Sequence, residues 1–194
     1  PYPQLLTMIT TPLTTKLTFE EYLAYDDGTD NHYELEDGAL ILMNPPIGLH
    51  AIILTFLTNT LFNEINRLQL PWIPLQLVGV RTSIRRSRLP DLCVVPLEQM
   101  QPYLNVSAVL ESGVLLAIEL VSPDSVKRDY RFKRAEYASF GIPEYWIIDP
   151  AAQKVTLLLL VEGLYEETVY QGDDPIQSET FPELVLTVNQ VLQQ

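Results

Sequence analysis

Cysteine and histidine are scarce in this chain, which narrows the kinds of site that it can hold. Cys93 is the single cysteine among 194 residues, and there are two histidines. A disulfide framework and a zinc site built on several cysteines are therefore excluded. No apolar run is long enough for a membrane-spanning helix. Residues 1–15 lack the positive charge that opens a secretory signal, so we expect a cytoplasmic protein without a membrane partner.

Positive charge is also scarce, with 12 Lys and Arg against 25 Asp and Glu and a formal net charge of −13. This total disfavours a general attraction to polyphosphates. The basic residues nevertheless concentrate in two segments. Window 1 holds Arg81, Arg85, Arg86 and Arg88, and window 2 holds Lys127, Arg128, Arg131, Lys133 and Arg134. Both windows are candidate phosphate-binding surfaces because a local field depends on nearby charges; an ordinary solvated surface is the alternative.

Hydrophobic periodicity and turn residues predict a mixed α/β domain. We expect helices over residues 18–25, 50–68 and 129–140 and a brief helix at the C-terminal end. We expect strands over residues 32–36, 39–43, 73–85, 91–95, 114–121, 144–148, 154–161 and 164–170. The length fits one domain over residues 18–194, preceded by an irregular lead-in over residues 1–17.

The predicted helix over residues 50–68 has an unusually wide apolar stripe. Its main apolar face is widened by Ile52, Phe56 and Phe62. A helix of this kind is either deeply packed or part of a subunit interface. A homodimer is therefore one expected assembly.

Three carboxylates interrupt apolar strand sequence. Glu119 lies within the predicted strand 114–121, Asp91 begins a strand directly after Pro90, and Glu34 lies in the first hairpin. An ionised carboxylate in a dry site costs several kcal/mol unless a cation or a donor compensates it. Two readings stay open: each acid is paired structurally, or Asp91 and Glu119 share a divalent cation such as Mg²⁺.

Several stretches of the chain together resemble one family. They are Tyr33-Glu34-Leu-x-x-Gly38, His50, Pro90-Asp91, Ile118-Glu119-Leu-Val-Ser122-Pro123, Asp129-x-x-x-Lys133 with Tyr137, and Gly141-Ile-Pro-Glu-Tyr-Trp-Ile-Ile-Asp-Pro150. They are similar to a large bacterial family of restriction-endonuclease-like proteins in the PD-(D/E)XK nuclease superfamily. The resemblance covers roughly residues 18–190.

The resemblance implies a restriction-endonuclease-like core, a mixed β-sheet flanked by helices, with Mg²⁺ or Mn²⁺ at the paired acids. Asp91, Glu119 and the main-chain carbonyl of Leu120 would be metal ligands, and Glu34 an accessory acid of the catalytic site. The implied reaction is hydrolysis of a phosphodiester in DNA by a metal-activated water. Phosphate would be bound by Arg81, Arg85, Arg86, Arg88, Lys127, Arg128 and Arg131.

One position departs from the superfamily pattern. The lysine that normally lies two places after the second acid is Val121 here. Lys133 is the natural substitute, and its spacing from Asp129 places both on one helix face, where a simple ion pair is the alternative. Asp129, Tyr137 and His50 are further accessory candidates. His50 is one of two histidines and begins the longest predicted helix, where it could act as a base or could simply be a polar helix-start residue.

The prediction is therefore a metal-dependent endonuclease-like phosphodiesterase. The alternative is a catalytically weak or inert binding or assembly module on a nuclease scaffold, favoured by the net charge and by Val121. A third reading is hydrolysis of a smaller phosphate ester. Similarity of fold alone does not choose among these functions.

Overall fold

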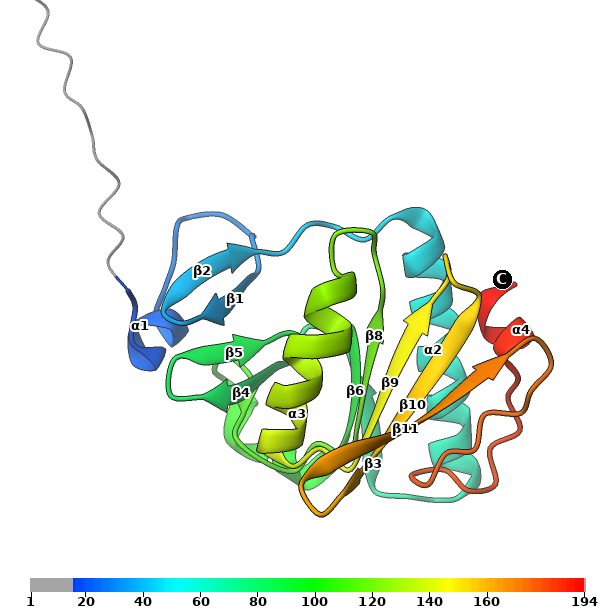
Figure 1. Cartoon of the computed structure of the whole chain (residues 1–194). Coiled ribbons are helices and arrows are strands. Elements are labelled where there is room, and N and C mark those ends of the chain that lie inside the picture. The colour runs from blue at the N-terminus through cyan, green and yellow to red at the C-terminus, as the bar shows by residue number, and fades with distance from the viewer. Residues whose placement is uncertain (1–15, 194) are drawn as a thin grey trace, which may run out of the picture.

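Two mixed β-sheets flanked by helices make up residues 16–193, the part of the chain that this computed structural model describes (Figure 1). The larger sheet has six strands in the order β11-β10-β9-β8-β6-β3, and the smaller has five in the order β2-β1-β5-β4-β7. The predicted mixed α/β class is confirmed, with two sheets where we expected one. The predicted lead-in lies, up to residue 15, outside the described residues, and the single domain stays a prediction.

The strands of the larger sheet are β3 (Trp72–Leu75), β6 (Leu92–Pro96), β8 (Leu116–Leu120), β9 (Glu144–Asp149), β10 (Lys154–Val161) and β11 (Leu164–Gln171). Those of the smaller sheet are β1 (Tyr33–Glu36), β2 (Ala39–Leu42), β4 (Gly79–Ser83), β5 (Arg86–Arg88) and β7 (Val109–Leu110). The helices are α1 (Phe19–Leu23), α2 (Gly48–Arg67), a 3₁₀ segment η1 (Leu97–Tyr103), a π-helical turn η2 (Arg128–Lys133), α3 (Arg134–Phe140) and α4 (Val188–Leu192).

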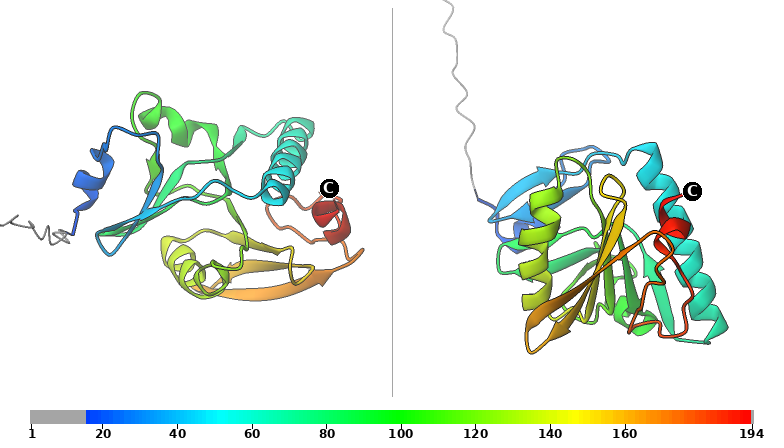
Figure 2. Two further views of the ribbon diagram at one scale, coloured as in Figure 1. Left: turned by 90° about the horizontal axis from the view of Figure 1, so that it is seen from above. Right: turned by 45° about the vertical axis from the view of Figure 1, so that its right-hand side comes forward.

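Both faces of the larger sheet are covered, by α2 and α4 on one side and α3 on the other (Figure 2). Alternation along β8 divides its buried side chains between the two faces: Leu116, Ile118 and Leu120 belong to the cluster with α2, whereas Ala117 and Val121 belong to the cluster with Tyr137 of α3. This explains why β8 reads as an almost continuous apolar run.

The N-terminal hairpin forms as predicted. Asp37 and Gly38 connect β1 to β2 with φ values of 49° and 85°, the left-handed conformation that a tight hairpin turn requires. Helix α1 starts at the expected capping box, in which the side chains of Thr18 and Glu21 each accept a hydrogen bond from the other residue's backbone.

The predicted strand over residues 73–85 is divided between the two sheets. β3 pairs with β6 of the larger sheet, whereas β4 pairs with β5 of the smaller one. Leu77, with a φ of 59°, lies in the intervening segment, where a left-handed residue cannot continue a strand. β5 was not predicted as a separate strand, because its sequence Arg-Ser-Arg has no alternation of apolar and polar residues.

The predicted helix over residues 129–140 is present but begins in a different form. Its first part is the π-helical turn η2, and regular α-helix starts at Arg134. Gly141 ends the helix in the left-handed conformation, with a φ of 92°, as expected for a C-cap glycine. A π-helical turn often marks a functional position in a helix.

Helix α2 is packed on one side only. Ile52 and Phe62, which widen its apolar stripe, are 52% and 49% exposed, so residues 16–193 leave them about half uncovered. Among residues 16–193, no helix combines the length and the hydropathy needed to cross a bilayer.

Candidate active site

Asp91 and Glu119 lie on the same face of the larger sheet, next to each other. β6 pairs antiparallel with β8, with Leu92 opposite Ile118. Continuing this register by one residue places Asp91 opposite Glu119. Because side chains alternate along a strand, both acids then project from the face covered by α3 and not from the face covered by α2. The backbone N–H of Leu120 donates to Oδ2 of Asp91 at 2.7 Å, which fixes the carboxylate beside β8.

The ammonium of Lys133 lies among three carboxylates. Its Nζ is 2.8 Å from Oε2 of Glu119, 3.5 Å from Oδ1 of Asp129 and 3.7 Å from Oε1 of Glu34. All four side chains are at most 3% exposed. The structure therefore brings together the acids and the lysine that the sequence placed in one candidate site, although their chemical roles stay predictions.

Burial controls the protonation of the two central acids. It raises the pKa of Glu119 to about 8, since the nearby Lys133 only partly offsets the loss of solvation and the Asp91 charge adds to it. Burial also raises the pKa of Asp91, against the opposing charges of Lys133 and His50. The hydroxyl of Tyr137 donates to Oε1 of Glu119 at 2.6 Å. Tyr137 and Lys133 therefore bind one oxygen each of the Glu119 carboxylate.

Glu34 is held by different partners. Its Oε1 accepts the backbone N–H of Leu89 at 3.0 Å, and its Oε2 accepts from Nη1 of Arg88 at 3.1 Å. Burial acts to raise the pKa of Glu34, but Lys133 and Arg88 outweigh it and lower the pKa below the usual value. Burial acts to lower the pKa of Lys133, but the surrounding acids outweigh it and raise the pKa. Among these acids Glu119 contributes most, followed by Glu34. Lys133 is thus kept charged.

The π-helical turn positions Asp129. The Ser125 hydroxyl donates to Oδ2 of Asp129, and the hydroxyl of Tyr145 donates to its main-chain carbonyl at 3.1 Å. Asp129 and Lys133 are four residues apart on this segment, with Nζ of Lys133 3.5 Å from Oδ1 of Asp129 and 2.8 Å from Oε2 of Glu119.

His50, the third residue of α2, is only 9% exposed. It lies close enough to Asp91 for its charge to oppose the effect of burial on that carboxyl's pKa. His50 therefore lies near Asp91, and its accessory role stays a prediction.

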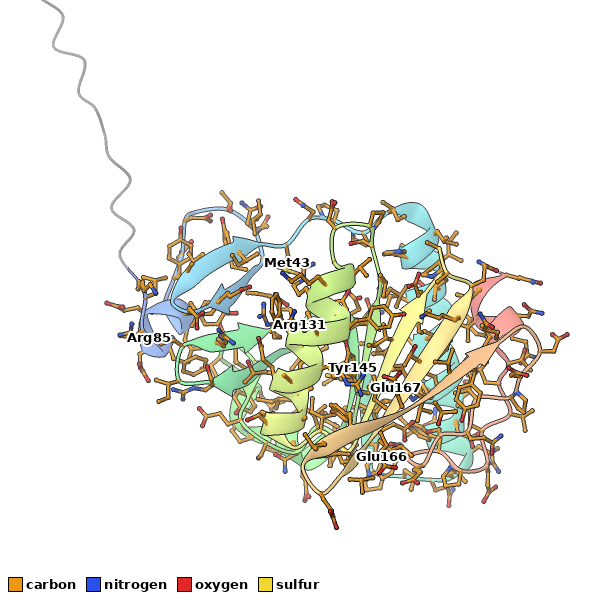
Figure 3. The ribbon with its side chains drawn as sticks, in the orientation of Figure 1. Met43, Arg85, Arg131, Tyr145, Glu166 and Glu167 are labelled. Carbon is orange, nitrogen blue, oxygen red and sulfur yellow. The ribbon has the colours of Figure 1, made fainter. Side chains whose placement is uncertain are left out.

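The arginines of window 1 mostly lie away from an open surface. Arg81 pairs with Glu111 at 3.0 Å and stacks on the Phe19 ring, and Arg86 pairs with Asp37 at 2.7 Å. Arg88 is 1% exposed, so no phosphate can reach it without a rearrangement. Arg85 is exposed in the turn between β4 and β5 (Figure 3).

Window 2 provides the accessible cations near the site. In the described part of the chain, Lys127, Arg128 and Arg131 of the η2 region have no acidic partner within 4 Å, unlike Arg134, which pairs with Glu167. Lys127 and Arg131 are exposed, and Arg128 is half-buried. Figure 3 places Arg131 on the same helical segment that carries Lys133.

The sequence did not predict the actual roles of three residues near the site, which are Arg88, Glu36 and Glu136. Arg88 donates to Glu34, Glu36 and Glu136, and the bond to Glu136 is bidentate, at 2.7 and 2.8 Å. The only sequence signal was the place of Arg88 in window 1, which indicated a phosphate contact. Partner identity depends on how β1, β5 and α3 pack together, which no local pattern encodes.

The donor set suits a small site for a hard cation. Within residues 16–193, no three His, Cys, Asp or Glu side chains are grouped so that they could hold one ion. Asp91 and Glu119 remain as a pair of candidate oxygen ligands. Mg²⁺ commonly takes one or two carboxylates and keeps several waters, so this pair fits the group that the resemblance implies.

Comparison with known proteins agrees with this architecture. The structure is similar to the crystal structure of a protein from Anabaena variabilis ATCC 29413 described as a "putative nuclease belonging to DUF820". The TM-score is 0.76 and the identity 20%, over 91% of this chain and 98% of that one. No curated protein matches the chain. The chain thus shares its α/β fold with that protein.

The family follows from the sequence match. Residues 19–189 match the model of the family described as "Uma2: Putative restriction endonuclease". The chain belongs to this family, and the resemblance found in its motifs is confirmed.

The raised pKa of Glu119 predicts an unusual dependence of stability on pH. Between its ordinary value of 4.5 and about 8, the native carboxyl keeps a proton that the unfolded chain has lost. Unfolding then releases a proton, so the free energy of unfolding falls as pH rises, by about 1.4 kcal/mol per pH unit near the middle of this window. Glu119→Gln removes this contribution.

Urea unfolding of the wild type and of Glu119→Gln, from pH 5 to 8 in the presence of EDTA, measures this dependence of the free energy of unfolding on pH. We expect the stability of the wild type relative to Glu119→Gln to fall steadily as pH rises. Parallel pH profiles would contradict the prediction.

Proposed function

We propose that this protein is a divalent-metal-dependent nuclease that hydrolyses phosphodiester bonds in DNA. The observation that carries the proposal is the meeting of Asp91, Glu119 and Lys133 on one face of the larger sheet, with Lys133 Nζ 2.8 Å from Glu119. Two acids and a cation are the groups that metal-assisted phosphodiester hydrolysis requires. The family and the nuclease-like fold support the same class of reaction.

Asp91 and Glu119 would hold Mg²⁺ or Mn²⁺, together with the main-chain carbonyl of Leu120. A bound Mg²⁺ would supply water activation and would neutralise charge on the phosphate. Oδ2 of Asp91 and both oxygens of Glu119 are already bonded to protein donors. These donors orient the two carboxylates before any ligand binds.

Lys133 would act on the substrate, and the other residues of the site would position Lys133 and the two acids. Lys133, kept charged by its neighbours, would stabilise the negative charge that develops on the phosphate. Asp129 and Glu34 would hold its ammonium in place, and Tyr137 would orient Glu119. Glu34 is committed to Arg88 and to Leu89, so its role is support of Lys133 and not the binding of a second ion. His50 would add a polar group beside Asp91.

DNA would approach over the η2 region. Lys127, Arg128 and Arg131 shortly precede Lys133 in the sequence and are free of acidic partners within the described residues. On a protein with a net charge of −13, these cations offer the favourable path for a phosphate backbone. Window 1 is largely neutralised by Glu111, Asp37 and the buried glutamates.

A homodimer would suit cleavage of both strands. Ile52, Thr55, Asn59 and Phe62 form an exposed stripe along α2 that is symmetric about residue 57. Two copies crossing antiparallel would place Ile52 against Phe62 of the partner subunit, as a two-fold interface requires. The stripe carries no charge, so no like charges would face each other across the contact.

Cleavage of plasmid DNA tests the reaction. With Mg²⁺ or Mn²⁺ we expect nicking by the wild type and a loss of at least about 100-fold in rate for Asp91→Asn, Glu119→Gln and Lys133→Met, because each removes a ligand or the charge that stabilises the transition state. Glu166→Gln, an exposed acid on β11, is the control and should cut normally. Inactivity of the wild type with DNA binding retained would favour the binding-module alternative.

The salt dependence of DNA binding tests the approach. Each phosphate contact contributes about 0.9 to the slope of log K against log salt. Arg131→Ala and Lys127→Ala should each weaken binding for all sequences and reduce the slope by about one. Arg86→Ala, which removes an arginine already paired with Asp37, should leave the slope unchanged. The reverse ranking would place the DNA on window 1.

Sedimentation or light scattering tests the dimer. We expect a dimer for the wild type and a monomer for Ile52→Glu and Phe62→Glu, because each substitution buries a charge in an apolar contact. Leu164→Glu changes an equally apolar residue on β11 that is 74% exposed, and it should stay dimeric. A monomeric wild type would end this part of the proposal.

A further inference from the structure

Arg88 is the most completely buried cation on the smaller sheet. Its side chain is 1% exposed, and its guanidinium is surrounded by three glutamates from two different parts of the fold. Glu34 and Glu36 come from β1, and Glu136 comes from α3. Arg88 therefore joins the N-terminal hairpin to the helix that carries Lys133.

The bonds of Arg88 define how these elements meet. Nε and Nη2 donate to the two oxygens of Glu136 at 2.8 and 2.7 Å, and Nη1 donates to Glu34 at 3.1 Å and to Glu36 at 3.0 Å. The planar guanidinium can bind a carboxylate with two parallel bonds, which sets orientation as well as distance. Glu136 also accepts from the hydroxyl of Thr82 at 2.9 Å, so the helix is held to β4 and β5 together.

Arg88 is connected to the candidate active site in two ways. Along the side chains, Arg88 binds Oε2 of Glu34, whose Oε1 faces Nζ of Lys133 at 3.7 Å. Along the helix, Glu136 follows Lys133 by three residues and precedes Tyr137, which donates to Glu119. A displacement of Arg88 would therefore move both groups that bind the Glu119 carboxylate.

We propose that Arg88 is a positioning residue, which fixes Lys133 and Tyr137 against Glu119 by clamping Glu34 and Glu136, and that it makes no contact with DNA. The inference rests on the proposed function and adds to it a residue that acts through others. It also replaces the phosphate-binding role that the basic sequence of window 1 suggested for Arg88.

Kinetics and binding of three variants test this role. Arg88→Met removes the positive charge and the bidentate donor group, and Arg88→Lys keeps only the charge. Arg67→Met breaks a bidentate bond to Glu64 on α2 and is the matched control. We expect Arg88→Met to lower kcat by about 10- to 100-fold, the range for residues that orient ligands. KM for DNA and the salt slope should not change. Arg88→Lys should restore little, because an ammonium cannot form the bidentate bond.

A triple variant separates positioning from folding. Arg88→Met alone leaves buried glutamates without a partner and can unfold the chain. Arg88→Met with Glu34→Gln and Glu136→Gln leaves no buried charge unpaired at these positions, so we expect it to fold with a Tm near that of the wild type while kcat stays low. Recovery of kcat in this variant, or a reduced salt slope in Arg88→Met, would overturn the inference.

A measurement without catalysis decides the inference independently. A buried ammonium held by carboxylates exchanges its protons slowly and gives a ¹H–¹⁵N signal for Nζ. We expect the Lys133 signal to be lost in the triple variant. It should be kept in Glu34→Gln, which removes the acid that faces Lys133 but leaves the bond between Arg88 and Glu136, and in Arg67→Met. Its persistence in the triple variant would refute the positioning role. If the wild type cuts no DNA but the signal behaves as expected, the proposed function fails and the positioning role stands.

Discussion

The buried ammonium of Lys133 is the interaction on which the arrangement of this site depends. Four acids surround it electrostatically, and an uncompensated charge of either sign at such a depth costs several kcal/mol. Each acid has its own second partner: Tyr137 for Glu119, Ser125 for Asp129, Leu120 N–H for Asp91, and Arg88 with Leu89 N–H for Glu34. Lys133 therefore does not compensate the acids alone, and each donor comes from an element whose position the fold must maintain.

This requirement explains why the smaller sheet matters to the site. The acids at β6 and β8 belong to the larger sheet, but Glu34 and Arg88 come from β1 and β5. The hairpin is joined to α3 through charged groups, since Arg88 and Glu136 are buried between them. Ionic contacts of this kind are directional, so they define the orientation of two elements more closely than apolar packing does.

The local elements of the fold could be predicted from the sequence, whereas the partners of the buried charges could not, for physical reasons. Asp37-Gly38, the capping box at Thr18 and the glycine at 141 are local signals, and all three elements form as expected. Glu119 was recognisable because it interrupts an apolar strand. The ion pairs of Arg88 were not, because charge in a sequence says nothing about which acid a fold brings near. The π-helical turn also has no sequence pattern of its own, and the Tyr145 hydroxyl that donates to its Asp129 carbonyl comes from a strand that follows later in the chain.

The substitution of Val121 for the usual lysine can be understood from the same geometry. Val121 follows Glu119 by two residues and so projects from the same face, where it packs with Tyr137 and Tyr145 in an apolar cluster. Lys133 reaches that face from the helix above it, and its ammonium contacts Glu119 directly. The charge beside the acid is thus kept while the strand position becomes part of the core. The exchange requires a helix held closely over β8, and the glutamates bound by Arg88 are what hold it there.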